Sequence, residues 1–223
     1  MMYPDDYVAG LIFQDFKRRL VQANFERAVQ ALEEMKRFHS GQTRKDGQPF
    51  YVHPLSVAIR VADATRFTNE TAIIAATFHD VLEDGMKDGR KVELKDIQNY
   101  GEEVIEAVCC LTFTYELEST DADYRQLQKA VTKSICYANM IKSPLAVLIK
   151  LYDRIDNTST IGSLPPQNRS NNYHDTHDNL LPMVRNLLRA NKKNPYHYEI
   201  RVAATSLADL NTALAYADGV LLD

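Results

Sequence analysis

Apolar residues recur at intervals of three and four along much of this chain, and that periodicity predicts amphipathic α-helices. The segment NFERAVQALEEMKRFH (24–39) is one example. Its apolar residues fall near helical spacing at Ala28, Val29, Leu32, Met35 and Phe38. Charged residues separate them, so the predicted helix has one apolar face and one polar face.

A second helix is predicted in HPLSVAIRVADAT (53–65), directly beside His53. Pro54 stands in the first turn, where its missing N–H costs nothing because that group has no partner within a helix. The residues expected to face inward are Leu55, Val57, Ala58, Val61 and Ala62.

Two further segments are apolar on most sides and therefore predict central helices. The first is TNETAIIAATFHDVLEDG (68–85), which has Thr68 or Asn69 as a capping residue. The second is SPLAVLIKLYDRIDNTSTIG (143–162), which has Ser143 as its cap. Each segment carries charged residues at its end, although its middle is almost free of polar atoms.

The distribution of glycine and proline supports an all-α fold. No glycine occurs from 102 to 161, and Pro144 is the only proline there, so long uninterrupted helices are expected. Residues 198–223 predict one more helix. Clusters of Gly, Pro, Asn and Ser predict loops at 40–50, 85–91 and 162–172. Because none of these loops is long enough to separate domains, we expect a single domain.

The composition is that of an ordinary globular protein, with 223 residues, 45% of them apolar and 25% charged. The net charge of −4 offers no basis for nucleic-acid binding, and local basic groups must hold any anionic ligand. The N-terminus is acidic where a secretory signal is basic, and no run approaches the roughly 18 apolar residues of a membrane span. We therefore expect a cytoplasmic protein with no membrane partner, and the sequence does not set its oligomeric state.

The three cysteines do not suggest redox or zinc-thiolate chemistry. Cys109, Cys110 and Cys136 form no CxxC pair and lie in apolar helical surroundings. This spacing predicts reduced, buried thiols.

The most informative polar residues follow the apolar run that ends at Phe78. In a continuous helix, His79 and Glu83 would share one face, and Asp80 and Asp84 the neighbouring face, one turn apart. An adjacent histidine and acid can reach one metal ion. Because two ligands seldom hold a catalytic metal, further ligands must come from other helices.

His53 and Asp153 are the candidates for these further ligands, since each lies in an otherwise apolar predicted helix. Two imidazoles and two carboxylates suit Mn²⁺, Fe²⁺ or Zn²⁺ and leave positions for water and substrate. Glu83 and Asp84 would then be free for acid–base chemistry. The alternative is structural: Asp153 forms a salt bridge with Arg154 or Lys150, and His53 is an ordinary core residue.

Three segments together resemble a known family. They are SGQTRKDGQPFYVHP (40–54), AATFHDVLEDG (75–85) and LIKLYDRIDNTSTIGSLPP (148–166). Their order and spacing resemble the hydrolase domain of RelA/SpoT homologues, within the HD superfamily. The resemblance runs from about 25 to 188. It implies that 1–223 form a single HD-domain helical bundle of roughly eight to ten helices, with a helical extension at 189–223.

The resemblance also implies an activity, namely Mn²⁺-dependent removal of the 3′-pyrophosphate from (p)ppGpp to give GDP or GTP. In that family the metal ligands match His53, His79, Asp80 and Asp153. The two acids that serve hydrolysis match Glu83 and Asp84.

The family's nucleotide-binding residues match Arg44 and Lys45, with Arg44 against the guanine base, and Asn157 near the nucleoside. The chemistry agrees, because a planar guanidinium stacks on a base and an ammonium is a point charge for phosphate. The alternatives are a solvated Arg–Lys pair in a loop and a hydrogen-bonding Asn157 at a helix end.

The sequence departs from the family at Asp156, Ser159 and Gly85, where histidine, arginine and threonine are usual. The exchange of positive groups for an acid leaves a second hypothesis open: hydrolysis of another nucleotide, such as the 2′-phosphate of NADPH or a nucleoside monophosphate. A third is a nucleotide-binding or antitoxin-like module without catalysis, although such a module has no need for acid–base carboxylates. His174 and His177 form an HxxH pair that is expected to lie at the surface.

Overall fold

The computed structural model describes residues 4–44, 47–113 and 122–222. Helices dominate them, and the all-α prediction is confirmed. The α-helices are α1 (Pro4–Gln22), α2 (Glu26–Phe38), α3 (Val52–Ala64), α4 (Glu70–Thr77), α5 (Val81–Asp84), α6 (Leu94–Ile97), α7 (Glu102–Leu111), α8 (Ala122–Met140), α9 (Pro144–Ser159), α10 (Pro166–His174), α11 (Leu181–Ala190) and α12 (His197–Ala217). Ten of these twelve described helices have eight or more residues, which matches the expected bundle.

Short elements connect the helices. Two 3₁₀ turns, η1 (Gln98–Tyr100) and η2 (Ile161–Ser163), follow α6 and α9, and a π-helical segment, η3 (Asp175–Leu180), joins α10 to α11. A small antiparallel hairpin pairs β1 (Met86–Lys87) with β2 (Arg90–Lys91). This hairpin occupies the segment where the sequence predicts a loop.

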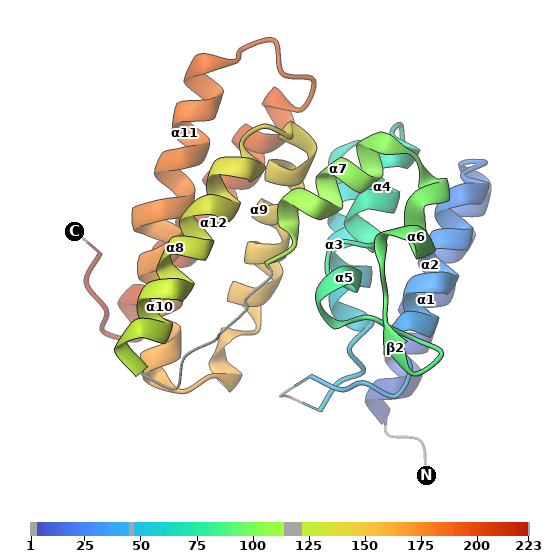
Figure 1. Ribbon diagram of the computed structural model, residues 1–223, viewed down its shortest axis with the longest axis horizontal. Coiled ribbons are helices and arrows are strands. Elements are labelled where there is room, and N and C mark those ends of the chain that lie inside the picture. Colours follow the sequence, from blue (N-terminus) through green and yellow to red (C-terminus); the bar gives the residue numbers. More distant parts are fainter. Residues whose placement is uncertain (1–3, 45–46, 114–121, 223) are drawn as a thin grey trace.

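Helix α9 lies between the two groups of helices seen in Figure 1, with α1–α7 on one side and α8 and α10–α12 on the other. It packs against α3 and α12 and also contacts α4, α7 and α8. Most of its side chains are buried, so the predicted central position is confirmed. Ser143 caps α9 by accepting a hydrogen bond from the Ala146 amide at 3.4 Å.

The neighbouring helices α3 and α4 form the other part of the core around the site. The five residues of α3 expected to face inward are all buried. Asn69 caps α4 by accepting a hydrogen bond from the Ala72 amide at 2.9 Å, and the run from Ala72 to Phe78 is fully buried. One hydrophobic cluster contains the buried apolar residues of these helices together with those of α9 and most of those of α12.

The expectation of one continuous helix over 68–85 is wrong. Helix α4 ends at Thr77, a turn follows through His79 and Asp80, and α5 begins at Val81. The Nδ1 atom of His79 bonds to the Ala76 carbonyl at 2.8 Å, and this is the carbonyl that an uninterrupted helix would pair with the Asp80 amide. His79 and Glu83 therefore do not share a helix face.

Two further expectations need correction, and one helix is additional to those expected. The predicted loop at 162–172 contains the start of α10, because Pro166 fits the first turn of a helix. Helix α1 was not predicted. The thiols are free, as expected, but Cys109 is exposed and Cys110 and Cys136 are only partly buried. In α7, the buried face is formed by other residues and does not include the two cysteines. No helix in the described part of the chain is long and apolar enough to cross a lipid bilayer.

Candidate metal centre and its cavity

Three segments far apart in the sequence bring polar side chains to one point. His53 lies in the first turn of α3, His79 in the turn after α4, and Asp153 in the middle of α9. The two Nε2 atoms of the histidines are 3.3 Å apart, and His53 Nε2 is 3.1 Å from Asp153 Oδ1. One ligand atom from each of the three buried residues lies within 4.8 Å of the others, so together they form a potential metal site.

Asp80 lies beside this group. Its Oδ1 is 3.3 Å from His79 Nε2, and its Oδ2 is 3.4 Å from His53 Nε2. Ligand atoms bound about 2.1 Å from one ion lie about 3.0–3.4 Å from one another in octahedral or tetrahedral geometry. The observed spacing of imidazole nitrogens and carboxylate oxygens fits such a group around a single divalent ion.

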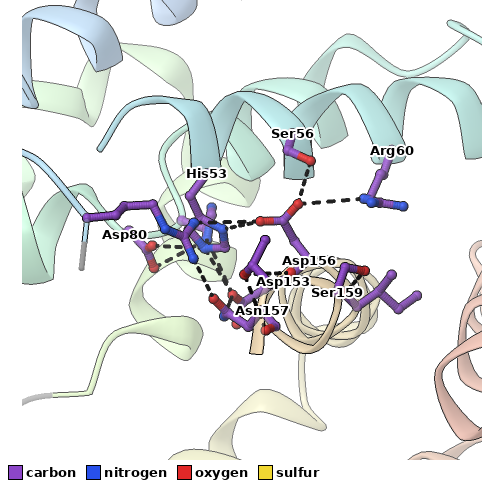
Figure 2. Close-up of polar contacts among 12 residues, drawn as sticks. His53, Ser56, Arg60, Asp80, Asp153, Asp156, Asn157 and Ser159 are labelled. Carbon is purple, nitrogen blue, oxygen red and sulfur yellow. Dashed lines mark hydrogen bonds and ion pairs between the residues drawn. The ribbon is translucent and has the colours of Figure 1, made fainter. Parts of the chain in front are cut away.

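The outer edges of the two imidazole rings determine which nitrogen faces the centre. His79 is held through Nδ1 by the Ala76 carbonyl, and His53 Nδ1 lies 2.7 Å from Asp156 Oδ2 (Figure 2). A histidine that ligates a metal usually donates its other N–H in this way, which fixes the ring. Both Nε2 atoms are therefore free to serve as ligands.

The ionisable groups of this cluster shift one another's pKa values. Burial opposes protonation of His53, but hydrogen bonds to Asp153, Asp156 and Asp80 outweigh it and raise the pKa of His53 well above its ordinary value. Burial likewise disfavours the charged form of Asp153, but the Lys150 ammonium and the two imidazoles hold its pKa far below the usual range. Metal binding must displace protons from the imidazoles, because only the neutral ring is a ligand.

The sequence left open a purely structural role for Asp153, a salt bridge with Arg154 or Lys150, and the structure contains the one with Lys150. Lys150 donates a hydrogen bond to Asp153 Oδ2 at 2.7 Å, while Arg154 turns away and pairs with Asp175 at 2.8 Å. Asp153 Oδ1 remains directed at the imidazoles and accepts a 2.5 Å hydrogen bond from Asn157 Nδ2. One carboxylate therefore takes part in a salt bridge and in the potential metal site.

A cavity of about 550 Å³ opens in front of this cluster. It is lined by Thr43, Arg44, Phe50, His53, Asp80, Glu83, Asp84, Lys150, Asp153, Asn157, Thr160, Ser163, Leu164 and Asn172. Every described residue of the predicted site lines this cavity except His79, which is buried behind it. Lys45 lies outside the described residues.

The two acids after the HD pair lie beside the cluster. Glu83 accepts a 2.5 Å hydrogen bond from the Phe113 amide, and burial raises the pKa of Glu83 to about 7. Burial also raises the pKa of Asp84, with a further contribution from the Asp80 charge. A carboxyl that titrates near neutrality can accept or return a proton under ordinary conditions.

Among the other lining residues of the cavity, Arg44 Nη2 donates to Asn157 Oδ1 at 3.3 Å. Asn157 therefore links a cation at the cavity wall to the Asp153 carboxylate. Sequence reasoning missed Lys150 as a cavity residue, although its position one turn before Asp153 on an apolar helix was an available signal.

Two positions at which the sequence differs from the usual family residues, Ser159 and Gly85, lie in different surroundings. Ser159 Oγ donates to the Ile155 carbonyl of its own helix at 2.7 Å and is absent from the described cavity lining. A Cβ atom on Gly85 would lie 2.4 Å from the Val81 carbonyl oxygen, so threonine would require the backbone to shift. His174 and His177 both face Asp178 at the surface, at 3.4 and 2.8 Å.

Comparison with known proteins agrees with this architecture. The model of a family described as HD domain matches residues 31–180, which is most of the chain. The chain belongs to the HD-domain family. HD domains are metal-dependent, and the three buried residues of the potential metal site lie within the matched region.

Among similar proteins is a guanosine-3′,5′-bis(diphosphate) 3′-pyrophosphohydrolase of Aquifex aeolicus, 32% identical over 73% of this HD-domain chain and 22% of the relative. Another is the bifunctional (p)ppGpp synthase/hydrolase SpoT of Escherichia coli, 31% identical over 81% of this chain and 24% of the relative. The chain thus spans about a quarter of the length of these relatives.

A solved structure of a metazoan ortholog of SpoT, a protein that hydrolyzes ppGpp, has a similar fold. Its TM-score is 0.56 at 21% sequence identity, and the match covers 87% of this chain and 96% of the other. The helical bundle therefore shares its fold with that structure.

Proposed function

We propose that this HD-domain chain is a metal-dependent hydrolase that removes the 3′-pyrophosphate from ppGpp and pppGpp, giving GDP or GTP and pyrophosphate. The observation that carries the proposal is the convergence of His53, His79, Asp80 and Asp153 at one point beside a cavity that Glu83 also lines. The names of the relatives from Aquifex aeolicus and Escherichia coli support the choice of substrate.

The four residues His53, His79, Asp80 and Asp153 would hold the ion, and we propose Mn²⁺, with Fe²⁺ and Zn²⁺ as alternatives because all three accept mixed nitrogen and oxygen ligands. When bound, a divalent ion polarises a phosphoryl oxygen and lowers the pKa of coordinated water. The donor set fits this role, since it combines buried acids with imidazoles whose Nδ1 atoms are already engaged.

Glu83 and Asp84 are proposed to move the protons. Hydrolysis forms a bond from a water oxygen to the phosphorus next to the 3′ oxygen and breaks the bond from that phosphorus to the 3′ oxygen. The water gives up a proton and the leaving 3′ oxygen gains one. Glu83, with a pKa of about 7, is suited to accept the proton of the water. Asp84 also lines the cavity and is proposed to take part in the proton transfer.

Arg44, Lys45 and Asn157 are proposed to bind the nucleotide. Arg44 lines the cavity, and its guanidinium is oriented by Asn157, which leaves a planar face for a guanine base. Lys150 adds a second described cation, which is suited to a phosphate oxygen. We further propose that 1–223 form one domain, whose extension at 189–223 includes helix α12 packed on α9.

One observation favours a second candidate, an HD phosphohydrolase acting on another nucleotide such as NADPH at its 2′-phosphate or a nucleoside monophosphate. Asp156 Oδ2 lies 3.7 Å from Arg44 Nη1, and this partly neutralises a cation that a multiply charged substrate would use. A less charged nucleotide would lose less from that neutralisation.

The deciding experiment is a nucleotide panel with Mn²⁺, in which phosphate and pyrophosphate are detected separately. We expect pyrophosphate from ppGpp and pppGpp and no phosphate from NADPH or nucleoside monophosphates. Release of phosphate alone would favour the second candidate. Tight ppGpp binding with no product after long incubation would indicate a binding module, and robust turnover without metal would reject the proposal.

A further inference from the structure

Asp156 lies behind His53, on the side of the imidazole away from the metal centre (Figure 2). Its side chain is almost fully buried, and it reaches from α9 to α3. The Oδ2 atom is 2.7 Å from His53 Nδ1. The Oδ1 atom accepts a hydrogen bond from Ser56 Oγ at 2.5 Å, one turn from His53 on the same helix. Each carboxylate oxygen is therefore fixed by a different residue of α3.

Two arginines complete the surroundings of Asp156. Arg44 Nη1 lies 3.7 Å from Oδ2, and Arg60 Nε lies 3.9 Å from Oδ1. The Arg60 Nε atom is buried without a hydrogen-bond partner, so Asp156 is its nearest compensating charge. A carboxylate held by two positive groups and two hydrogen bonds is stabilised in its charged form despite its burial.

The position of Asp156 excludes it from the set of metal ligands. It binds the Nδ1 edge of His53, whereas Asp153, Asp80 and His79 all approach the Nε2 edge. An imidazole ring without a partner at Nδ1 can turn over, because its χ2 torsion has two broad minima. His79 is held by a backbone carbonyl, but His53 depends on the Asp156 side chain.

We propose that Asp156 is a positioning residue that keeps His53 protonated at Nδ1 and directed through Nε2 at the metal ion, while the same carboxylate anchors Arg44 at the cavity wall. This inference rests on the metal site of the proposed function. A carboxylate partner orients a ligating histidine and also increases its basicity, so it strengthens the bond to the metal. Asp156 thereby connects the metal centre to a nucleotide-binding residue.

The test measures Mn²⁺ affinity by calorimetry, without nucleotide, in four variants of the full chain. Asp156→Leu removes the acceptor at similar volume and is expected to weaken Mn²⁺ binding by about 10–100-fold. Asp156→Asn keeps one acceptor oxygen but loses the charge, and should have a smaller effect. Ser56→Ala releases one carboxylate oxygen and should have the smallest effect.

The matched control is Asp178→Asn. Asp178 also faces a histidine Nδ1, that of His177 at 2.8 Å, but this pair is exposed on a different element. Its removal should leave Mn²⁺ affinity unchanged. This control shows whether the loss of any Asp–His pair weakens Mn²⁺ binding, or only the loss of the Asp156–His53 pair.

The unfolding temperature of each metal-free variant separates positioning from structural support. An Asp156→Leu protein that is less stable but binds Mn²⁺ as tightly as wild type would overturn the inference. If Asp156→Leu does not fold, unchanged affinity in both Asp156→Asn and Ser56→Ala overturns it. In Zn²⁺-loaded protein, the His53 Nδ1–H signal in ¹⁵N NMR should be protected from exchange in wild type and lost in Asp156→Leu.

Kinetics give an independent readout. Asp156→Leu should raise the KM for the nucleotide, because Arg44 loses its anchor, and should lower kcat at subsaturating Mn²⁺. Excess Mn²⁺ should restore kcat but not KM. Weakened Mn²⁺ binding in a protein whose wild type releases no pyrophosphate would support the inference and overturn the proposed function, so the two failures are distinguishable.

Discussion

Two adjacent residues of α9 enter two different buried charge clusters. Arg154 pairs with Asp175, whose oxygens also contact Lys133 at 2.5 Å, Tyr137 at 3.0 Å and Asn179 at 3.1 Å. In this structural cluster, the charge and hydrogen-bonding groups of the Asp175 carboxylate are all paired with protein side chains. The preceding residue, Asp153, lies in the candidate metal centre.

The metal centre has the opposite charge balance. Asp80, Asp153, Glu83 and Asp84 line one cavity, and Arg44 and Lys150 are the cations among its described lining residues. Buried charges that protein groups neutralise are typical of structural salt bridges, whereas several acids and imidazoles around one cavity are typical of a functional site. The comparison shows that the balance of partners, rather than burial alone, distinguishes a binding site from a structural salt bridge.

The largest expected effect is removal of an acid from the metal centre. Asp80→Ala should abolish Mn²⁺ loading and lower kcat on the order of 10³-fold, because the ion loses a ligand. Metal analysis beside steady-state kinetics checks this. Chelation of wild type should abolish activity and added Mn²⁺ restore it; an Asp80→Ala protein that loads Mn²⁺ fully would contradict the assignment.

Glu83→Gln should separate metal binding from catalysis. The amide keeps the acceptor for the Phe113 N–H but cannot take a proton, so Mn²⁺ loading should persist while kcat falls about 10²–10⁴-fold. The measurement is metal content and kcat on the same preparation. Loss of both together would mean that Glu83 is a ligand rather than a proton acceptor.

In the structural cluster, Asp175→Ala should lower the free energy of unfolding by about 3–5 kcal/mol, because it leaves Arg154 buried without its partner. The folded variant should bind Mn²⁺ as wild type does. The control is Asp178→Ala, three residues along the same element but exposed, with an expected change within about 0.5 kcal/mol. Denaturant unfolding and Mn²⁺ titration test both, and weakened Mn²⁺ binding in Asp175→Ala would show that the two clusters are coupled.

The smallest expected effect concerns pH. Glu83 has a pKa of about 7 in the folded protein against an ordinary value of 4.5. Its stabilising contribution is therefore fully present below about pH 4.5 and lost as pH rises through about 7. Metal-free Glu83→Gln should gain stability relative to wild type over that range, on the order of 1–2 kcal/mol. Parallel stability curves for the two proteins between pH 5 and 8 would contradict this pKa.

Local patterns in the sequence predicted much of the fold. Apolar periodicity identified α2, α3, α9 and α12. The capping residues Asn69 and Ser143 were predicted because each is a short polar residue directly before an apolar run. The candidate metal ligands and the two following acids were proposed from their type and spacing, and Arg44, Lys45 and Asn157 from the resemblance to a family. These features depend on neighbours within a few positions, which the sequence displays directly.

The tertiary structure decided what those residues face. The break at His79 follows from the orientation of one ring, and the contact of Asp156 with the back of His53 joins positions more than a hundred residues apart. Asp153 shares its carboxylate with Lys150, while Arg154 turns to Asp175. Sequence alone determined which elements form and which chemical groups are present. The packing of α3 against α9 determined which of those groups meet, because partners distant along the chain are chosen by the geometry of the folded core.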